Sequence, residues 1–231
     1  MKTILFLLFF GSTATQLTAQ PNINAGLASR LQVNKTSFSQ VRNLLGEPAY
    51  LSNHADQQVV QYKNGKNICL LNFNKDQLLT ELMISLGDQE PPAALSYENA
   101  KLIAASPTQE MIQKLLGSPL DIRISATETS WWYKNGEKAL GLIFREATAE
   151  PFLFNYTEEN TSKATFTSAD TEQLHIGTSR LSDARLKWGM PTNLQFTNTG
   201  EQWQYKNDRQ QLWINAGRDG VITNYTLENL D

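Results

Sequence analysis

The sequence is poor in the residues that build covalent or metal-held frameworks. Of its 231 residues, one is a cysteine, Cys69, and two are histidines, His54 and His175. A lone cysteine excludes an intramolecular disulfide, so packing must supply the stability. Neither histidine has a second His, a Cys or paired carboxylates at ligand spacing, and no glycine-rich phosphate loop or nucleophile elbow occurs. We therefore expect no metal site, no cofactor, no catalytic residue and no enzymatic activity.

An excess of charge of one sign is also lacking. The chain has 20 Lys and Arg against 23 Asp and Glu, spread without long runs, and its formal net charge is −3. This balance provides no basic surface of the kind that binds nucleic acid or an anionic membrane. Nucleic acid and membrane surfaces are therefore not expected as partners.

Long apolar runs are absent beyond the first residues. Residues 4–10 form an unbroken apolar run behind Lys2, and residues 12–19 are small and polar. This order is typical of a secretory signal peptide, and the run is too short to span a bilayer. We expect a signal peptide over residues 1–19, export to the periplasm or the extracellular space, and no membrane span. No cysteine lies near the cleavage site after Ala19, so no lipid anchor is expected.

The chain does contain one pattern three times over. A glycine is followed by a proline two residues later and by a tyrosine 16 residues later, and the three glycines lie 71 and 72 positions apart. The three sets are Gly46, Pro48 and Tyr62; Gly117, Pro119 and Tyr133; and Gly189, Pro191 and Tyr205. Equal offsets of this kind indicate an internal repeat in which these nine residues are structural.

Each copy carries the signals of a short helix followed by strands. A polar residue stands where it can cap a helix of about ten residues; these caps are Thr36, Ser106 and Thr178. The repeated glycine can end the helix in a left-handed conformation, and the proline prevents its continuation. Asn64-Gly65 and Asn135-Gly136 then favour type I′ hairpin turns.

The fold class that follows is α+β, with three tandem αβββ repeats. In each repeat a short helix is expected to pack on a three-stranded antiparallel meander. The predicted boundaries are residues 20–91, 92–164 and 165–231, with connectors at 87–94 and 157–171. Because a unit of ~70 residues without disulfides would be marginally stable, we expect the three sheets to abut.

The hairpin register assigns the side chains to two faces of each sheet. One face is apolar and is expected to lie under the helices; in the first copy it carries Val60, Tyr62, Cys69, Leu71 and Phe73. The second copy places Trp131, Tyr133, Leu140, Leu142 and Phe144 there, and the third places Trp203, Tyr205, Leu212 and Ile214 there. The opposite face mixes polar and apolar residues and is expected to meet water.

Two tryptophans, Trp132 and Trp213, stand on this open face. An indole exposed on a polar surface can anchor a partner protein. Trp132 and Trp213 are therefore candidate partner-binding residues, with Ile68, Leu70 and Ile143 as rim contacts. The alternative is that a neighbouring loop or unit covers both indoles.

The helix ending in Leu-Gly-x-Pro and the Trp-x-Tyr strand together resemble a known repeat. The third copy shows it best, with Gly177-Thr178 opening the helix and Trp203-Gln204-Tyr205 on the strand. The repeat is similar to that of the SmpA/OmlA (BamE-like) outer-membrane assembly family and of β-lactamase inhibitor proteins. This resemblance implies a non-enzymatic protein that binds other proteins, in the inhibitors through the open, aromatic-rich face of a sheet. The chain departs from the first family by lacking an anchor cysteine, and from both by having three copies.

The leading hypothesis is an exported, non-enzymatic protein-binding module that uses the open face of an antiparallel sheet. Its partner is expected to be another envelope or extracellular protein, in envelope assembly or in enzyme inhibition. Two alternatives stay open: a hydrolase-type enzyme with an unrecognised site, and a purely structural repeat protein. An enzyme needs a concave pocket with perturbed ionisable groups, whereas a binder needs an exposed and preformed apolar patch.

Overall fold

The computed structural model of the chain describes residues 20–87, 95–105, 108–145, 151–158, 166–197 and 199–230. Several predictions fall outside these ranges: the signal peptide at 1–19, the cap Ser106, and most of the first connector, at 88–94. Residues 159–165 of the second connector also lie outside them, while its last four residues form a short helix.

The strands of the described residues form one antiparallel sheet in which the spatial order equals the chain order. They are β1 (Tyr50–Asn53), β2 (Gln57–Asn64), β3 (Asn67–Asn74), β4 (Leu79–Leu86), β5 (Asp121–Ile124), β6 (Glu128–Asn135), β7 (Lys138–Arg145), β8 (Pro151–Glu158), β9 (Asn193–Thr197), β10 (Gly200–Lys206), β11 (Gln210–Gly217) and β12 (Ile222–Asn229). The predicted fold of three separate αβββ units with abutting sheets was therefore wrong. β4 pairs with β5 and β8 pairs with β9, so the backbone groups that a separate unit would leave unpaired at its edge are satisfied.

Each run of strands also begins one strand earlier than predicted, at β1, β5 and β9. Directly after each repeated proline, a backbone N–H donates over 2.8 Å to the strand that carries the tyrosine. The three pairs are Ala49 to Gln61, Leu120 to Trp132 and Thr192 to Gln204. Proline is tolerated just before a strand because the hydrogen bond begins with the next residue. Four strands, rather than the predicted three, follow each repeated proline.

The helices are short: α1 (Leu27–Arg30), α2 (Phe38–Leu45), α3 (Tyr97–Ala105), α4 (Gln109–Leu116), α5 (Ser168–Thr171) and α6 (Leu181–Trp188). The predicted helices are α2, α4 and α6, and their N-caps are Ser37, Thr108 and Arg180, one or two residues beyond the predicted caps. Each ends at its repeated glycine, where Gly46, for example, has φ 80° and ψ −153°. The positive φ agrees with the prediction, but this ψ lies in a glycine-only region outside the left-handed helical one.

The 16-residue spacing between glycine and tyrosine has a direct cause. Each buried tyrosine hydroxyl donates to the carbonyl oxygen of the glycine that ends the helix of its own segment. The distances are 3.3 Å for Tyr62 to Gly46, 3.2 Å for Tyr133 to Gly117 and 3.0 Å for Tyr205 to Gly189. The hydroxyl thus satisfies a backbone carbonyl at the helix end and fixes the helix against the sheet.

The β2–β3 and β6–β7 hairpins turn one residue later than predicted. Asn64 pairs with Asn67 and Asn135 pairs with Lys138, so the central residues begin with Gly65 and Gly136. These glycines have φ of 60° and 59° while the residues after them are not at positive φ, which matches a type II′ turn instead of type I′. Moving the turn by one position changes each cross-strand partner by two residues, so every side chain stays on its predicted face.

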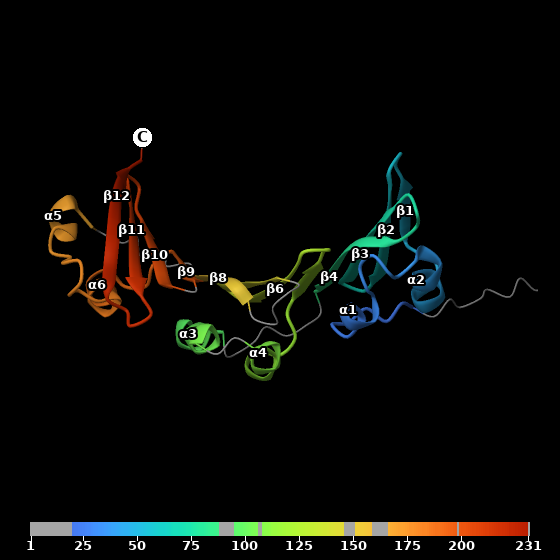
Figure 1. Ribbon diagram of the computed structural model, residues 1–231, viewed down its shortest axis with the longest axis horizontal. Coiled ribbons are helices and arrows are strands. Elements are labelled where there is room, and N and C mark those ends of the chain that lie inside the picture. The colour runs from blue at the N-terminus through green and yellow to red at the C-terminus, as the bar shows by residue number, and fades with distance from the viewer. Residues whose placement is uncertain are drawn as a thin grey trace, which may run out of the picture.

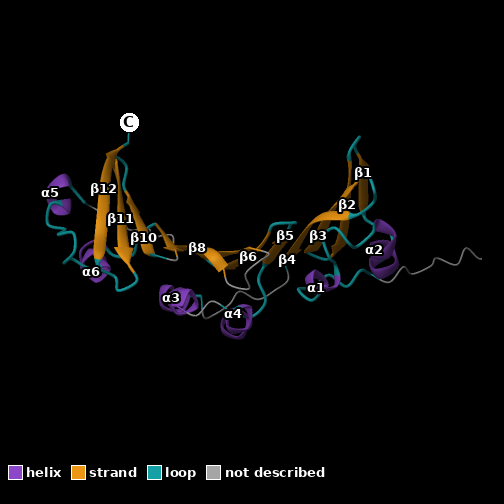
Figure 2. Ribbon diagram, in the orientation of Figure 1, coloured by secondary structure: helices purple, strands orange, loops and turns teal. Residues whose placement is uncertain are grey.

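The sheet is bent into a U, with the labelled helices on its outer side and its inner side free of helices (Figures 1 and 2). The predicted apolar face lies on the outer side and is buried, with Val60, Tyr62, Cys69, Leu71 and Phe73 all at 0% exposure. Bulges at Asn72/Phe73, Ile143/Phe144 and Asn215/Ala216 occur in the same strand pair of each segment. Because bulges bend and twist a strand, these three contribute to the curvature. We call the inner side the concave face.

Candidate binding surface on the concave face

The register of the sheet puts all five predicted partner-binding residues on the concave face. Trp132 lies opposite Gly141, Ile143 opposite Ser130, and Trp213 opposite Gln204. Trp132 is 43% exposed, whereas Ile68, Leu70, Ile143 and Trp213 are half-buried. Ile68 and Leu70 lie on β3, Trp132 and Ile143 on β6 and β7, and Trp213 far along the sheet on β11. The five residues therefore do not form one cluster.

Sequence reasoning missed Met83, which is 39% exposed and pairs with Leu70 across β3 and β4. Met83 lies between the buried residues Leu82 and Ile84 on β4, so its side chain points to the opposite face. This alternation could have identified Met83 from the sequence. Met83 completes a first apolar group on β3 and β4, while Trp132 and Ile143 form a second group on β6 and β7. We call these residues together the Trp132 patch: Ile68, Leu70, Met83, Trp132 and Ile143.

Strand β5 crosses between the two apolar groups and carries charge. Asp121 lies opposite Trp132 and Arg123 lies opposite Met83. Arg123 is bonded to Glu81 through its Nε, and Asn72 donates to the other oxygen of Glu81 over 2.8 Å. This pair is solvent-exposed, with 57% of the Arg123 side chain accessible, so it adds little stability. Its guanidinium is nevertheless held in a fixed direction beside the apolar groups.

The indole of Trp132 lies across the backbone of Gly141. A Cβ atom at position 141 would stand 2.8 Å from two ring carbons of Trp132, so only glycine admits the ring in this position. Glycine in a strand often marks a place where another group approaches the backbone closely. One face of the indole is thus packed on the sheet, and the exposed part is presented in a fixed orientation.

The part of the concave face formed by β8 to β12 has a different character. Five amide side chains follow one another across these strands as successive partners: Asn155, Gln195, Gln202, Asn215 and Asn224. We call them the amide row. Trp213 stands two residues along β11 from Asn215, in the neighbouring row opposite Gln204. The charged side chains at the described positions of this part of the face are Lys206 and Glu228, which both lie opposite Gln211.

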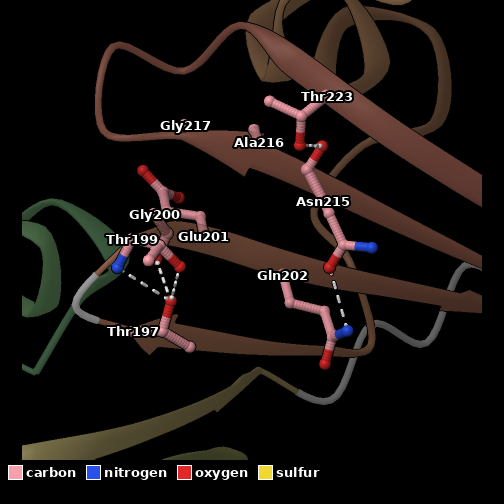
Figure 3. A pocket seen from close by; sticks show the side chains of 9 residues that line it. All are labelled: Thr197, Thr199, Gly200, Glu201, Gln202, Asn215, Ala216, Gly217 and Thr223. Carbon is pink, nitrogen blue, oxygen red and sulfur yellow. Dashed lines mark hydrogen bonds between the residues drawn. The ribbon is translucent and has the colours of Figure 1, made fainter.

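A pocket of about 370 Å³ opens beside Gln202 and Asn215, two inner members of the amide row (Figure 3). Its lining is neutral and polar apart from one carboxylate; it consists of Thr197, Thr199, Gly200, Glu201, Gln202, Asn215, Ala216, Gly217 and Thr223. Gln202 Nε2 donates to Asn215 Oδ1 over 2.9 Å, and Thr223 Oγ1 donates to the Asn215 carbonyl over 3.2 Å. These bonds hold the amides in place at the wall of the pocket.

Glu201, the ionisable residue of that lining, is 6% exposed and bonded on both oxygens. One carboxylate oxygen accepts from Trp203 Nε1 at 2.9 Å and from the Tyr97 hydroxyl at 3.1 Å, and the other contacts Lys101 Nζ at 3.1 Å. Burial, together with the adjacent Glu201 carboxylate, raises the pKa of the Tyr97 hydroxyl far above its usual value. The carboxylate thus ties α3 to β10 and has a partner on each oxygen.

Cys69, the thiol that the sequence singled out, lies in the buried core. Burial raises the pKa of the Cys69 thiol to about 12, so this group is neutral at physiological pH. Within the described ranges, no group of three His, Cys, Asp or Glu residues is placed to hold a metal ion. Those same residues include no helix with the length and apolar character needed to cross a membrane.

No family model and no curated protein matches this chain. A solved structure of a DUF4309 family protein (YjgB) from Bacillus subtilis is 21% identical, covers 49% of this chain and 73% of its own, and has a TM-score of 0.22. A structure from Streptococcus mutans described as a "putative beta-lactamase inhibitor protein" is 11% identical, covers 92% of this chain and 100% of its own, and has a TM-score of 0.32. The second description names one of the two groups that the repeat resembles, and neither names SmpA/OmlA. Similarity at this level assigns no family, site or function.

Proposed function

We propose that this protein is a non-enzymatic binder that holds another protein against its concave face, with the Trp132 patch as the anchor. The observation that carries this proposal is the indole of Trp132, which is packed on Gly141 and yet 43% exposed. A rigid, exposed aromatic ring loses little conformational freedom on binding, and tryptophan is enriched among residues that dominate interface energies.

The surroundings of Trp132 fit a protein interface better than a small-molecule site. Two apolar groups flank strand β5, which places the exposed charge of Arg123 and the half-buried charge of Asp121 between them. Apolar anchors beside charged groups are typical of protein interfaces, where the charges select the partner and its orientation. Truncating a central indole in such an interface costs about 2 kcal/mol or more, which is roughly a thirtyfold loss of affinity.

The signal peptide that the sequence predicts supports a partner in the envelope or outside the cell. Two forms of the function remain, inhibition of an enzyme and assembly of an envelope complex. They differ in the captured partner: an inhibited enzyme loses activity when the protein is added, whereas an assembly partner does not. The concave shape suits the convex surface of a folded partner in either case.

The first test is capture of partners from envelope and secreted fractions with the mature protein and two variants. Trp132→Ala removes the anchor, and Leu186→Ala is the matched control. Leu186 is also a large exposed residue, 88% accessible, but it lies on α6 on the outer side of the sheet. We expect the captured partner to be lost with Trp132→Ala and retained with Leu186→Ala, with both variants folded by circular dichroism.

Other outcomes would contradict the proposal in distinct ways. Capture that is lost only with Leu186→Ala would move the interface to the outer side, where Leu102 and Ile176 are also exposed. Capture that survives Trp132→Ala would exclude the Trp132 patch as the anchor. Absence of any partner for the parent protein would favour a structural role.

A further inference from the structure

We propose that the pocket and the amide row form a second binding site, which takes a linear, neutral oligosaccharide. The pocket lies on β9 to β12, and the proposal does not depend on the function proposed above. Of the amide row, Asn155 on β8 borders the Trp132 patch, since it lies opposite Gly141. Its volume of about 370 Å³ falls within the range of ~300–1,000 Å³ that is usual for small-ligand sites.

The chemistry of the lining selects the class of ligand by exclusion. The lining residues include no Lys or Arg, so a phosphate or another anion finds no countercharge. Glu201 already accepts from Trp203 and Tyr97 and contacts Lys101, so it is not available for a cationic ligand. A mainly polar lining of Thr, Gln and Asn also disfavours an apolar ligand, which would leave these groups without partners. What remains is a neutral molecule rich in hydroxyl groups.

Hydroxyl groups donate and accept at once, and so do the amides that line this site. Gln202 and Asn215 use one donor and one acceptor on each other over 2.9 Å. Within the described chain, no group bonds Gln202 Oε1 or Asn215 Nδ2, which leaves an acceptor at one end of the bonded pair and a donor at the other (Figure 3). Neighbouring hydroxyl groups of a pyranose ring can bond both.

The same chemistry continues beyond the pocket. The amide oxygens of Asn155, in the amide row, and of Asn193, in the neighbouring row, are buried and have no partner among the described residues, although buried acceptors are usually satisfied. Successive members of the row lie on neighbouring strands about 4.8 Å apart, which is close to the length of one pyranose unit. A short linear oligosaccharide that runs across the strands from the pocket can therefore meet Gln195 on one side and Asn224 on the other, the members of the row next to Gln202 and Asn215.

Trp213 provides the apolar contact that such a ligand needs. It lies about 7 Å along β11 from Asn215, at the spacing of two residues on one face of a strand. A sugar ring has an apolar C–H surface, and an indole is the largest flat surface on which it can pack. This placement gives Trp213 a role distinct from that of Trp132.

The test is isothermal titration calorimetry of the full mature protein with three neutral probes: cellotetraose, chitotetraose and maltotetraose. Tetragalacturonate serves as the charged counterpart. We expect at least one neutral probe to bind with a Kd on the order of 1 mM or tighter, and the charged probe not to bind. Failure of all three neutral probes at about ten times that concentration would overturn the proposal.

Isosteric variants locate the site. Gln202→Met and Asn215→Leu keep the size of the side chains and remove their hydrogen bonds, and we expect each to weaken binding at least tenfold. Trp213→Ala should weaken it similarly, while Trp132→Ala should leave it unchanged. Binding that is unaffected in both isosteric variants would overturn the assignment, and unchanged unfolding midpoints show that the variants are folded. If Trp132→Ala loses protein capture but still binds the sugar, the two proposed sites are shown to be separate.

Discussion

Two regions of the concave face present different chemistry on the same backbone. The Trp132 patch on β3 to β7 is apolar and has charged neighbours in Arg123 and Asp121. The amide row on β8 to β12 is polar and almost uncharged. On the opposite side of the sheet the two regions are alike, since Tyr133 and Tyr205 each bond to the glycine that ends a helix.

This contrast separates what specifies the fold from what specifies recognition. The outer side is constrained by packing and by the helix ends, so its residues recur from segment to segment. The concave side packs against none of the described helices (Figure 2), so its residues can differ without loss of the sheet. One continuous sheet can therefore carry two surfaces for two kinds of ligand.

The largest loss of stability is expected from Gly200→Ala, at the start of β10. A Cβ atom at position 200 would stand 1.9 Å from the carbonyl oxygen of Ala216, and a backbone atom of the neighbouring strand cannot move aside easily. We expect this variant to lose about 3 kcal/mol or more of the free energy of unfolding, measured by urea denaturation.

Gly117→Ala is a control for Gly200→Ala, because it tests the strain of a positive φ without a steric clash. Gly117 has φ 74°, but no atom lies within 4 Å of the place that an added methyl group would take, so only the strained conformation is at issue. Its cost should be about 1–2 kcal/mol, which is smaller than that of Gly200→Ala. Equal costs at the two positions would show that the contact with Ala216 is unimportant.

The next largest loss of stability is expected from replacing Glu201, whose buried carboxylate lies at the pocket. Glu201→Leu leaves Trp203 Nε1 and the Tyr97 hydroxyl without their shared acceptor, which should cost about 2–3 kcal/mol. Glu201→Gln is the matched control, because its amide oxygen can still accept both bonds and only the exposed Lys101 pair is lost. In thermal or urea unfolding, Glu201→Gln should retain most of the stability that Glu201→Leu loses. Equal losses in the two variants would show that the charge of Glu201, and not its hydrogen bonds to Trp203 and Tyr97, stabilises this site.

The sequence predicted the faces of the sheet better than its extent. Alternation with period two placed Tyr62, Trp132 and Ile143 on the correct sides, because a face is a local property of a strand. The strands β1, β5 and β9 were missed because they are short and half-polar, as in Asp121–Ile124. The continuity of the sheet was missed because pairing of β4 with β5 is a contact between backbone edges, which leaves no pattern in the side chains.

The candidate sites were also predicted only where the signal is local in the sequence. Trp132 was found from its position in a hairpin, but its support by Gly141 depends on the exact register. The bond between Tyr97 and Glu201 joins residues 104 positions apart and has no local signal. The pocket depends on a bulge at Asn215/Ala216, which hydrophobic periodicity does not indicate.

A smaller effect is expected beneath the Trp132 patch, from Gly141→Ala. The added methyl group would meet the ring of Trp132, a side chain that can tilt, in contrast to the backbone that Gly200 faces. We expect a loss of only about 1 kcal/mol in stability, together with a shift in tryptophan fluorescence and weaker capture of the protein partner. Because Trp213 is remote, sugar binding should not change. A fluorescence spectrum identical to that of the parent would show that the indole does not rest on Gly141.

The smallest effect on stability is expected from Arg123→Ala, which removes the exposed pair with Glu81. Such pairs contribute about 0–1 kcal/mol, so urea unfolding should hardly change. Recognition should change instead, because exposed charges at an interface act mainly on the association rate and on its salt dependence. Surface plasmon resonance at two salt concentrations should show slower association for Arg123→Ala at low salt and nearly equal rates at high salt. If stability falls and association does not, Arg123 belongs to the fold and not to the interface, and the division between the two sides of the sheet fails at this residue.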